Sequence, residues 1–129
     1  MSTASIFAVL QQIAQTIPGC RLTSVVDAET GMAIASVSAE GVGSAAAGAD
    51  AYHADMYRFV GRAMDALGAP QDVESLVLVG DYSVFISLPF NERYFWHVVT
   101  TRETTVGYTQ AMMRRYSVQV AESVRGLVV

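Results

Sequence analysis

The chain has 129 residues, a length that favours a single domain burying roughly two-thirds of its unfolded surface. Only 16% of the residues are charged, against about 25% in an average globular protein, and 52% are hydrophobic. The net charge of -4, with eight scattered arginines and no lysine, excludes the basic surface that a nucleic-acid partner requires. Because few charges are present to cover a small domain, we expect part of the surface to pack against another chain.

Cysteine usage and the N-terminus indicate the compartment. A lone cysteine, Cys20, excludes an intramolecular disulfide and is consistent with a reducing environment. The N-terminal residues lack a positive leader region, and Gln11 and Gln12 interrupt their apolar pattern. No apolar run approaches the ~18 residues needed to span a bilayer. We therefore expect one cytoplasmic, soluble domain over residues 1–129, with no membrane insertion.

The first predicted elements are a helix and a hairpin. Apolar residues recur every three or four positions in residues 3–17, at Ile6, Leu10, Ile13 and Ile17. Pro18 and Gly19 end this helix. Two short β-type runs follow, "RLTSVVD" and "MAIASV". Gly31 can adopt the positive φ that closes the turn between them, and Asp27 can accept hydrogen bonds from the turn backbone.

A central helix is predicted after a stretch of small residues. Residues 38–49 carry little side-chain volume and are interpreted as a loop that leads into the helix. Residues 50–67 show helical periodicity, with an apolar stripe formed by Tyr52, Met56, Phe59, Ala63 and Leu67. The charged residues of this segment fall on the other face, at Asp55, Arg58, Arg62 and Asp65.

The second half of the chain predicts three strands and a closing helix. The strand runs are "ESLVLVGD", "YSVFISLPF" and "YFWHVVTT". The last run is apolar on both faces, as expected for a strand covered by a layer on each side. Residues 104–126 form the final helix, with an apolar stripe at Met113, Tyr116, Val120, Val124 and Leu127. The resulting order, α-β-β-α-β-β-β-α, predicts an α+β fold with a single five-stranded antiparallel sheet and helices on both faces.

This order and three local stretches resemble the Roadblock/dynein light-chain family. The stretches are "LQQIAQTIPGC", "SVVDAETGMAIAS" and "VESLVLVGDYSVFISLP", and the resemblance covers essentially the whole chain. It implies a Roadblock/profilin-like sheet that begins with the hairpin, and in which Gly31 serves backbone geometry. It also implies a homodimer, or a heterodimer with a paralogous Roadblock chain.

In that family the central helix and the following strand form the dimer contact, so that two sheets join into one. The resemblance places this contact at residues 50–67 and 74–81 here, and the interface residues that we expect are Tyr52, Met56, Phe59, Ala63, Leu76 and Leu78. Two features of the sequence agree with this contact. The alanine-rich segment 45–51 allows close backbone approach, and "SLVLVG" is an apolar edge that needs a partner.

The resemblance further implies a non-enzymatic protein that binds and regulates, or scaffolds, a small Ras-like GTPase. Such a partner can act by ordering the GTPase's own catalytic groups. Arg58 and Arg62, on the polar face of the central helix, are the candidate partner-binding residues. The alternative is a small-molecule sensor or a structural scaffold on the same fold, with Tyr94, Phe95 and Trp96 lining an apolar pocket under the closing helix.

The motifs for catalysis and for cofactors are weak. Gly41-x-Gly43-x-x-Ala46 approaches a dinucleotide fingerprint but lacks the parallel βαβ context. Two histidines and one cysteine do not show the spacing of metal ligands. His53 is expected to be exposed, His97 to be a hydrogen-bonded core or interface residue, and Cys20 to be a structural thiol.

The remaining candidate for acid–base chemistry is a pair of carboxylates. Asp27 and Glu29 lie together in the hairpin turn, where we expect them to be solvated and catalytically idle. The sequence therefore predicts no catalytic residue, no cofactor and no metal.

Overall fold

The computed structural model describes residues 3–68 and 73–127. Its elements in chain order are α1 (Thr3–Thr16), β1 (Cys20–Asp27), β2 (Ala33–Ser38), α2 (Ala45–Ala66), β3 (Leu76–Val79), β4 (Ser83–Pro89), β5 (Tyr94–Thr101) and α3 (Val106–Leu127). This confirms the predicted order of three helices and five strands. None of the described helices is long and apolar enough to cross a lipid bilayer.

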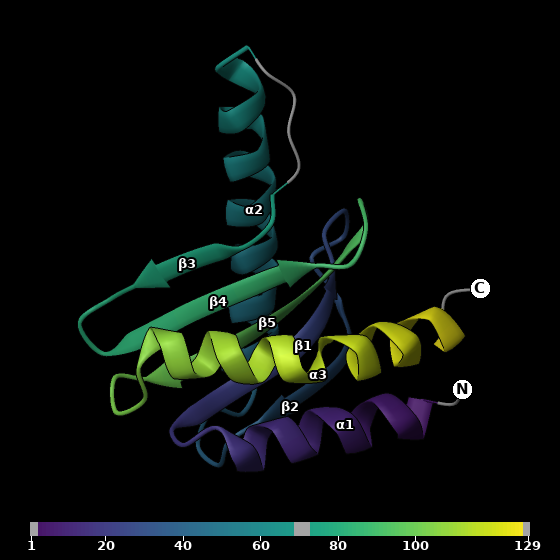
Figure 1. Cartoon of the computed structure of the whole chain (residues 1–129), viewed down its shortest axis with the longest axis vertical. Coiled ribbons are helices and arrows are strands. Elements are labelled where there is room, and N and C mark those ends of the chain that lie inside the picture. Colours follow the sequence, from purple (N-terminus) through teal and green to yellow (C-terminus); the bar gives the residue numbers. More distant parts are fainter. Residues whose placement is uncertain (1–2, 69–72, 128–129) are drawn as a thin grey trace.

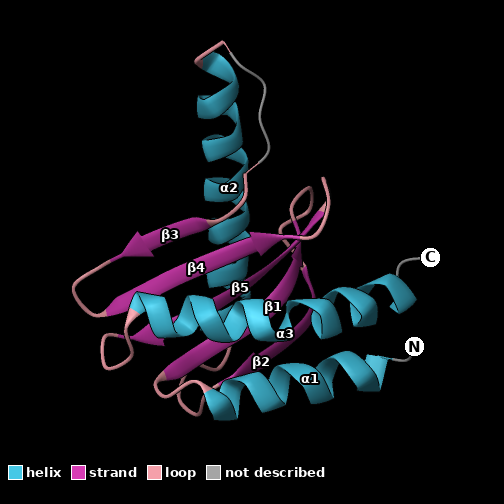
Figure 2. Cartoon of the chain, in the orientation of Figure 1, coloured by secondary structure: helices cyan, strands magenta, loops and turns pink. Residues whose placement is uncertain are grey.

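The five strands form one antiparallel sheet in the order β2-β1-β5-β4-β3. Helices α1 and α3 lie side by side on one face, and α2 lies on the other (Figure 1). The N-terminal half of α2 crosses the sheet, whereas its C-terminal half extends past the edge formed by β3 (Figure 2). A long part of α2 is therefore free of the sheet.

The main hydrophobic core lies between the sheet and the pair α1 and α3. The predicted stripe of α1 is buried there, together with Trp96 and Val98 of β5 and with Met113, Val120 and Val124 of α3. The side chain of Leu127 lies outside the described part of the chain. Burial of such aliphatic side chains contributes about 1.5–3 kcal/mol each, so this face supplies most of the apolar stabilisation.

The opposite face of the sheet, under α2, is chemically different. Its apolar cluster is small and centres on Val26, Ala54 and Phe95. Beside it the sheet presents serines and a histidine to α2, because the two-residue alternation along β1, β4 and β5 places Ser24, Ser87 and His97 on this side. Helix α2 therefore packs on a surface that is polar at its centre.

Two boundaries differ from the sequence prediction. Helix α2 begins at Ala45, five residues earlier than expected, because the alanine run that was interpreted as a loop has high helix propensity. Strand β3 covers only four residues, Leu76–Val79, because Gly80 and Asp81 already belong to the turn into β4. The other elements agree within two residues of the predicted ends.

The hairpin between β1 and β2 has the predicted turn chemistry. Gly31 has a φ of 75° and donates its backbone N–H to the Asp27 carbonyl at 2.8 Å. The Asp27 carboxylate accepts the backbone N–H of Glu29 at 2.9 Å. A Cβ atom on Gly31 would lie 3.3 Å from the Cα of Ala51, so this glycine also lets the turn approach α2.

We expect Gly31→Ala to lower the free energy of unfolding by about 1–2 kcal/mol, because alanine is strained at positive φ and its Cβ presses on α2. Gly61→Ala is the matched control, since Gly61 lies within α2 with open space around its Cα, and alanine there favours the helix. Urea denaturation of the two variants measures both effects. A Gly31→Ala protein as stable as the wild type would contradict the role given to this turn.

Candidate functional site

Helix α2 carries its apolar side chains on the side away from the sheet. Tyr52 and Phe59 are 74% and 60% exposed, whereas Asp50, His53 and Ala54 are buried against the sheet. This is the reverse of an ordinary amphipathic helix, in which the apolar stripe faces the core. An apolar stripe turned outwards on a long helix indicates a surface for another chain.

The stripe continues onto the neighbouring strand. Met56 of α2 and Leu78 of β3 line the same groove, which has a volume of about 310 Å³. Val79, Gly80, Ser83 and Phe85 complete its walls. We call the exposed and half-exposed set Tyr52, Met56, Phe59, Ala63 and Leu78 the α2–β3 face. The structure thus brings together five of the six residues that the sequence predicts for a dimer contact.

Leu76, the sixth predicted interface residue, does not belong to the α2–β3 face. Its exposed fraction is only 9%, because it pairs with the buried Ser87 of β4. Leu78 lies two residues further along on the same side of the strand and is 36% exposed. Leu76 therefore contributes to the protein's own interior.

Strand β3 leaves one side of its backbone open. Within the described residues it pairs only with β4, so the N–H and C=O groups on its outer side face no strand. Its sequence, "LVLV", holds no charge, proline or bulge of the kind that protects exposed edges. This edge and the α2–β3 face are adjacent, so a single partner can cover both.

The two candidate partner-binding arginines differ in their surroundings. Arg58 is half-buried, forms an ion pair with Asp55 and donates a hydrogen bond to the Ala28 carbonyl. Arg62 is exposed, and its guanidinium carbon lies 5.5 Å from the centroid of the Phe59 ring. Arg58 thus fastens α2 to the end of β1, whereas Arg62 borders the α2–β3 face.

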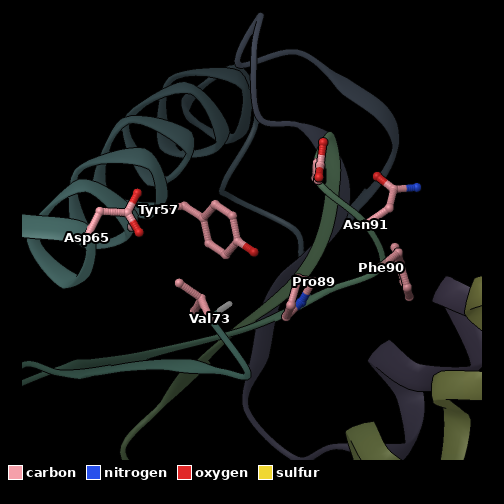
Figure 3. A pocket seen from close by; sticks show the side chains of 8 residues that line it. Tyr57, Asp65, Val73, Pro89, Phe90 and Asn91 are labelled. Atoms are coloured by element: carbon pink, nitrogen blue, oxygen red, sulfur yellow. The ribbon is translucent and has the colours of Figure 1, made fainter. Parts of the chain in front are cut away.

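A second hollow lies where the overhanging half of α2 meets the turn between β4 and β5 (Figure 3). It has a volume of about 410 Å³ and is lined by Tyr57, Gly61 and Asp65 of α2, by Val73, and by the segment from Pro89 to Glu92. The hollow is open to solvent, and its two carboxylates, Asp65 and Glu92, are exposed.

Polar residues of α2 and the sheet form a buried hydrogen-bonded cluster. The His97 Nε2 lies 2.6 Å from Asp50 Oδ1, and the Ser24 hydroxyl lies 3.2 Å from Asp50 Oδ2. The Ser36 hydroxyl lies 2.8 Å from that of Ser24, so it can donate to Ser24 while Ser24 donates to Asp50. A buried carboxylate is tolerated only with such partners.

His53 occupies the centre of the same cluster. Its Nε2 is hydrogen-bonded to the Ser87 hydroxyl, and its ring stacks on His97 with 4.6 Å between ring centroids. Phe85 and Phe95 stack on it at 5.4 Å each. Burial, followed by the neighbouring His97, lowers the pKa of His53 to about 3. His53 is therefore neutral at physiological pH.

The structure corrects the prediction that His53 is exposed. Its exposed fraction is zero, because His53 lies with Asp50 and Ala54 on the side of α2 that faces the sheet, whereas the charged residues Arg62 and Asp65 are exposed. His97 is confirmed as a hydrogen-bonded core residue. The signal for this arrangement was the alternation in the strands, which places Ser24, Ser87 and His97 on one face. Ser24, Ser87, His53 and His97 have no exposed surface.

The three aromatic residues of β5 do not share a pocket. Trp96 is fully buried among α1 and α3, where its indole N–H donates to the Thr23 hydroxyl at 2.8 Å. Phe95 is fully buried on the opposite face, under α2. Neither side chain lines any of the described hollows. Tyr94 lines an open hollow with Asn91, Glu92 and Arg93. The structure therefore does not bring the three aromatic residues together beneath the closing helix.

The carboxylates of the hairpin turn also differ from the prediction. Asp27 is buried, and its Oδ2 forms an ion pair with Arg93 at 2.9 Å. Burial alone would raise the pKa of Asp27, but hydrogen bonds from Arg93 and from the turn backbone lower it below its ordinary value. Glu29 is exposed and reaches Arg93 only at 3.8 Å. The ion pair between Asp27 and Arg93 connects the hairpin to the residue before β5, so its role is structural.

The small-residue motif does not lie in a dinucleotide-binding context. Gly41 and Gly43 occupy the turn between β2 and α2, and β2 runs antiparallel to β1, its partner in the sheet. A dinucleotide fold needs a parallel βαβ unit at this point. Among the described residues, no three histidine, cysteine, aspartate or glutamate side chains are placed to hold a metal ion.

Comparisons with known proteins identify the fold. No protein-family model matches the sequence, and no curated protein matches it in sequence. Solved structures do match, and the fold is that of the Roadblock/LC7 domains. A Roadblock/LC7 domain from Streptomyces avermitilis superposes with a TM-score of 0.78 and 16% identity, over 95% of this chain and 96% of that one.

A more particular likeness is to MglB. The Myxococcus xanthus MglB gives a TM-score of 0.83 at 15% identity, over 99% of this chain and 93% of that one. The gliding protein MglB of Thermus thermophilus gives 0.78 at 16% identity, over 93% and 88% of the two chains. At these identities the similarity concerns the fold.

Cys20 is half-buried beside the main core, with its Sγ 3.8 Å from the Leu22 carbonyl oxygen. Burial raises the pKa of the Cys20 thiol from 9.0 to about 11 and outweighs the smaller, lowering effect of the Leu22 backbone. Two pH units correspond to a roughly hundredfold smaller thiolate fraction at pH 8. We expect iodoacetamide to alkylate Cys20 about a hundred times more slowly in the native protein than in guanidinium. Equal rates in the two conditions would show a reactive thiol.

Proposed function

We propose that this protein is a non-enzymatic, dimeric interaction module that pairs through the α2–β3 face. The observation that carries the proposal is the outward apolar stripe of α2 beside the open, uncharged edge of β3. Pairing of two β3 edges would continue the sheet from one copy into the next, and the α2 helices would cover each other's apolar stripes. An unpaired strand edge and an exposed apolar stripe both favour aggregation, and this one contact covers both.

The chemistry of the surface favours a second copy of a similar chain over a charged partner. The α2–β3 face contains no charged side chain, and Arg62 at its border already stacks on Phe59. The low charge content of the whole chain points the same way. Of the structurally similar proteins, one MglB has been described in a tetrameric arrangement, so this fold supports assembly in that protein.

The dimer proposal is tested by substitutions that place charge on the face. Phe59→Asp and Leu78→Asp, both at exposed positions, should raise the dissociation constant of the dimer about 30-fold or more, as expected for central interface residues. Val118→Asp is the matched control, because Val118 is 66% exposed on α3, across the sheet. Analytical ultracentrifugation at several concentrations gives the constants.

A wild-type protein that stays monomeric at high micromolar concentration would refute the dimer. So would an unchanged dissociation constant in both face variants. Loss of the dimer in Val118→Asp alone would move the interface to α3.

We further propose that the dimer binds a small Ras-like GTPase and regulates or scaffolds it. The resemblance to the Roadblock family supplies this class of partner, and the fold is compatible with it. Two α2 helices lying together would form one composite surface bordered by the exposed Arg62 of each copy. Such a rigid surface can order the mobile switch segments of a GTPase without donating a catalytic group.

The GTPase proposal is tested by affinity capture from native lysate, with excess GTP analogue in one sample and GDP in the other. We expect mass spectrometry to identify a small GTPase that is enriched with one nucleotide, and Arg62→Glu to weaken its capture while leaving the dimer intact. Recovery of only this chain or a paralogue with both nucleotides would reject GTPase binding.

A further inference from the structure

The helix that carries the proposed interface is attached to the sheet through a cluster with no place for an additional proton. Both histidines use Nε2 in their hydrogen bonds, His97 to Asp50 and His53 to Ser87. The Nδ1 atoms of both rings are buried and have no hydrogen-bond partner among the described residues. As neutral Nε2–H tautomers the two rings leave only bare acceptor nitrogens unpaired, which costs less than an unpaired N–H.

Protonation changes this balance at His53 more than at His97. An imidazolium at His97 would lie beside the Asp50 carboxylate, which compensates its charge. An imidazolium at His53 would lie against Phe85, Phe95 and His97, and its new Nδ1–H would have no acceptor. The single carboxylate of the cluster is already engaged by His97 and Ser24. His53 can therefore accept a proton only by leaving its site.

The cluster is close enough to solvent for such a response. Ser36 and Asp50 line a hollow of about 480 Å³ between β2 and the first turns of α2. Only Asp50, His53 and Ala54 of the described α2 side chains are buried. The half-buried Tyr57, which stacks on Phe95, and Arg58, which donates to the Ala28 carbonyl, add to the contacts between the helix and the sheet. The main core, between the sheet and the pair α1 and α3, contains none of these residues. Opening of α2 can thus occur with the main core intact.

We propose that His53 is an acid-sensitive latch: its neutral ring holds α2 on the sheet, and its protonation releases the helix while α1, α3 and the main core remain folded. The consequence for assembly depends on the dimer proposed above, since release of α2 would also dismantle the α2–β3 face. The latch itself is internal to one chain. It therefore operates whether or not the dimer forms.

The groups that face His53 are few. Helix α2 contributes Asp50 and Tyr57, and β5 contributes His97, whereas β1, β2 and β4 present serines and apolar side chains. The ion pairs Asp55–Arg58 and Asp27–Arg93 lie outside the cluster, towards the hairpin end of the sheet. The chain has only two histidines, and histidine is the side chain whose unperturbed pKa lies between pH 5 and 8. The interval between pH 7 and pH 5 is therefore the one in which a variant without the His53 ring is compared with the wild type.

The direction of the pH effect follows from linkage. The pKa of His53 is lower in the closed state, at about 3, than its ordinary value of 6.5. The stabilisation from the neutral ring is therefore complete above pH 6.5 and decreases as the pH falls towards 3. The opening constant of α2 should rise roughly tenfold for each pH unit below 6.5, or about 25-fold between pH 7 and pH 5.

Hydrogen exchange followed by mass spectrometry tests this latch on the full chain. Protection factors, corrected for the intrinsic pH dependence of exchange, should fall about 25-fold in the sheet-facing turns of α2 between pH 7 and pH 5. Peptides from α1 and α3 should keep theirs. The matched variant His53→Phe with Ser87→Ala preserves the ring stack and removes the titrating group, so its α2 protection should not depend on pH.

Three results would overturn the latch. They are a flat α2 profile in the wild type, the same slope in the double variant, and parallel loss of protection in α1 and α3. If the double variant does not fold, the 15N chemical shifts of the two wild-type imidazole rings, followed as a function of pH, give the titration midpoint of His53 directly. A midpoint near pH 6.5 for His53 in a protein whose α2 stays protected would reject the proposal.

The dimer and the latch can fail separately. Repeating the exchange experiment on Leu78→Asp, which is designed to be monomeric, should give the same slope in α2. A monomeric wild type with this slope would reject the dimer and keep the latch. A stable dimer with pH-independent α2 protection would keep the dimer and reject the latch.

Discussion

The structure depends most on the buried contact between Asp50 and His97. The Asp50 carboxylate is only 2% exposed, and a buried carboxylate needs hydrogen-bond donors. His97 and Ser24 supply these donors. This requirement fixes the rotation of α2 about its own axis, because only one orientation directs Asp50 and His53 into the sheet. That rotation turns Tyr52 and Phe59 to the outside. The apolar surface available to a partner is thus a direct consequence of polar pairing inside the chain.

The two faces of the sheet make different contributions to the fold. The aliphatic face under α1 and α3 supplies the bulk of the hydrophobic stabilisation, and it does not involve α2. The polar face supplies orientation and little apolar burial, with Ala54 and Phe95 at its margin. Buried polar pairs of this kind add little net stability. Their better attested role is to specify how two elements, here α2 and the sheet, pack on each other. A helix held mainly by orientation is also the element most easily released, which is the basis of the proposed latch.

The fold was predictable from the sequence because each element has a clean local signal: the stripe of α1, the Gly31 turn, and the two-sided apolar β5. The start of α2 was not, since its first turn consists of alanines and glycine that are equally compatible with a loop. The burial of His53 could not be predicted, for a deeper reason. Hydrophobic periodicity assumes that apolar residues face inwards, and it therefore assigned His53 to solvent. Only the joint placement of Ser24, Ser87 and His97 on one face of the sheet reveals a polar interior, and this needs the strand register.

The central claim is that the inward polar pairing of α2 presents its apolar side to a second copy of the chain. An isotope-filtered nuclear Overhauser measurement on a dimer of one labelled and one unlabelled copy tests this most directly. The account predicts intermolecular contacts among Tyr52, Phe59 and Leu78, together with contacts between the backbones of the two β3 strands. Intermolecular contacts confined to β2 or to the outer side of α3 would contradict it.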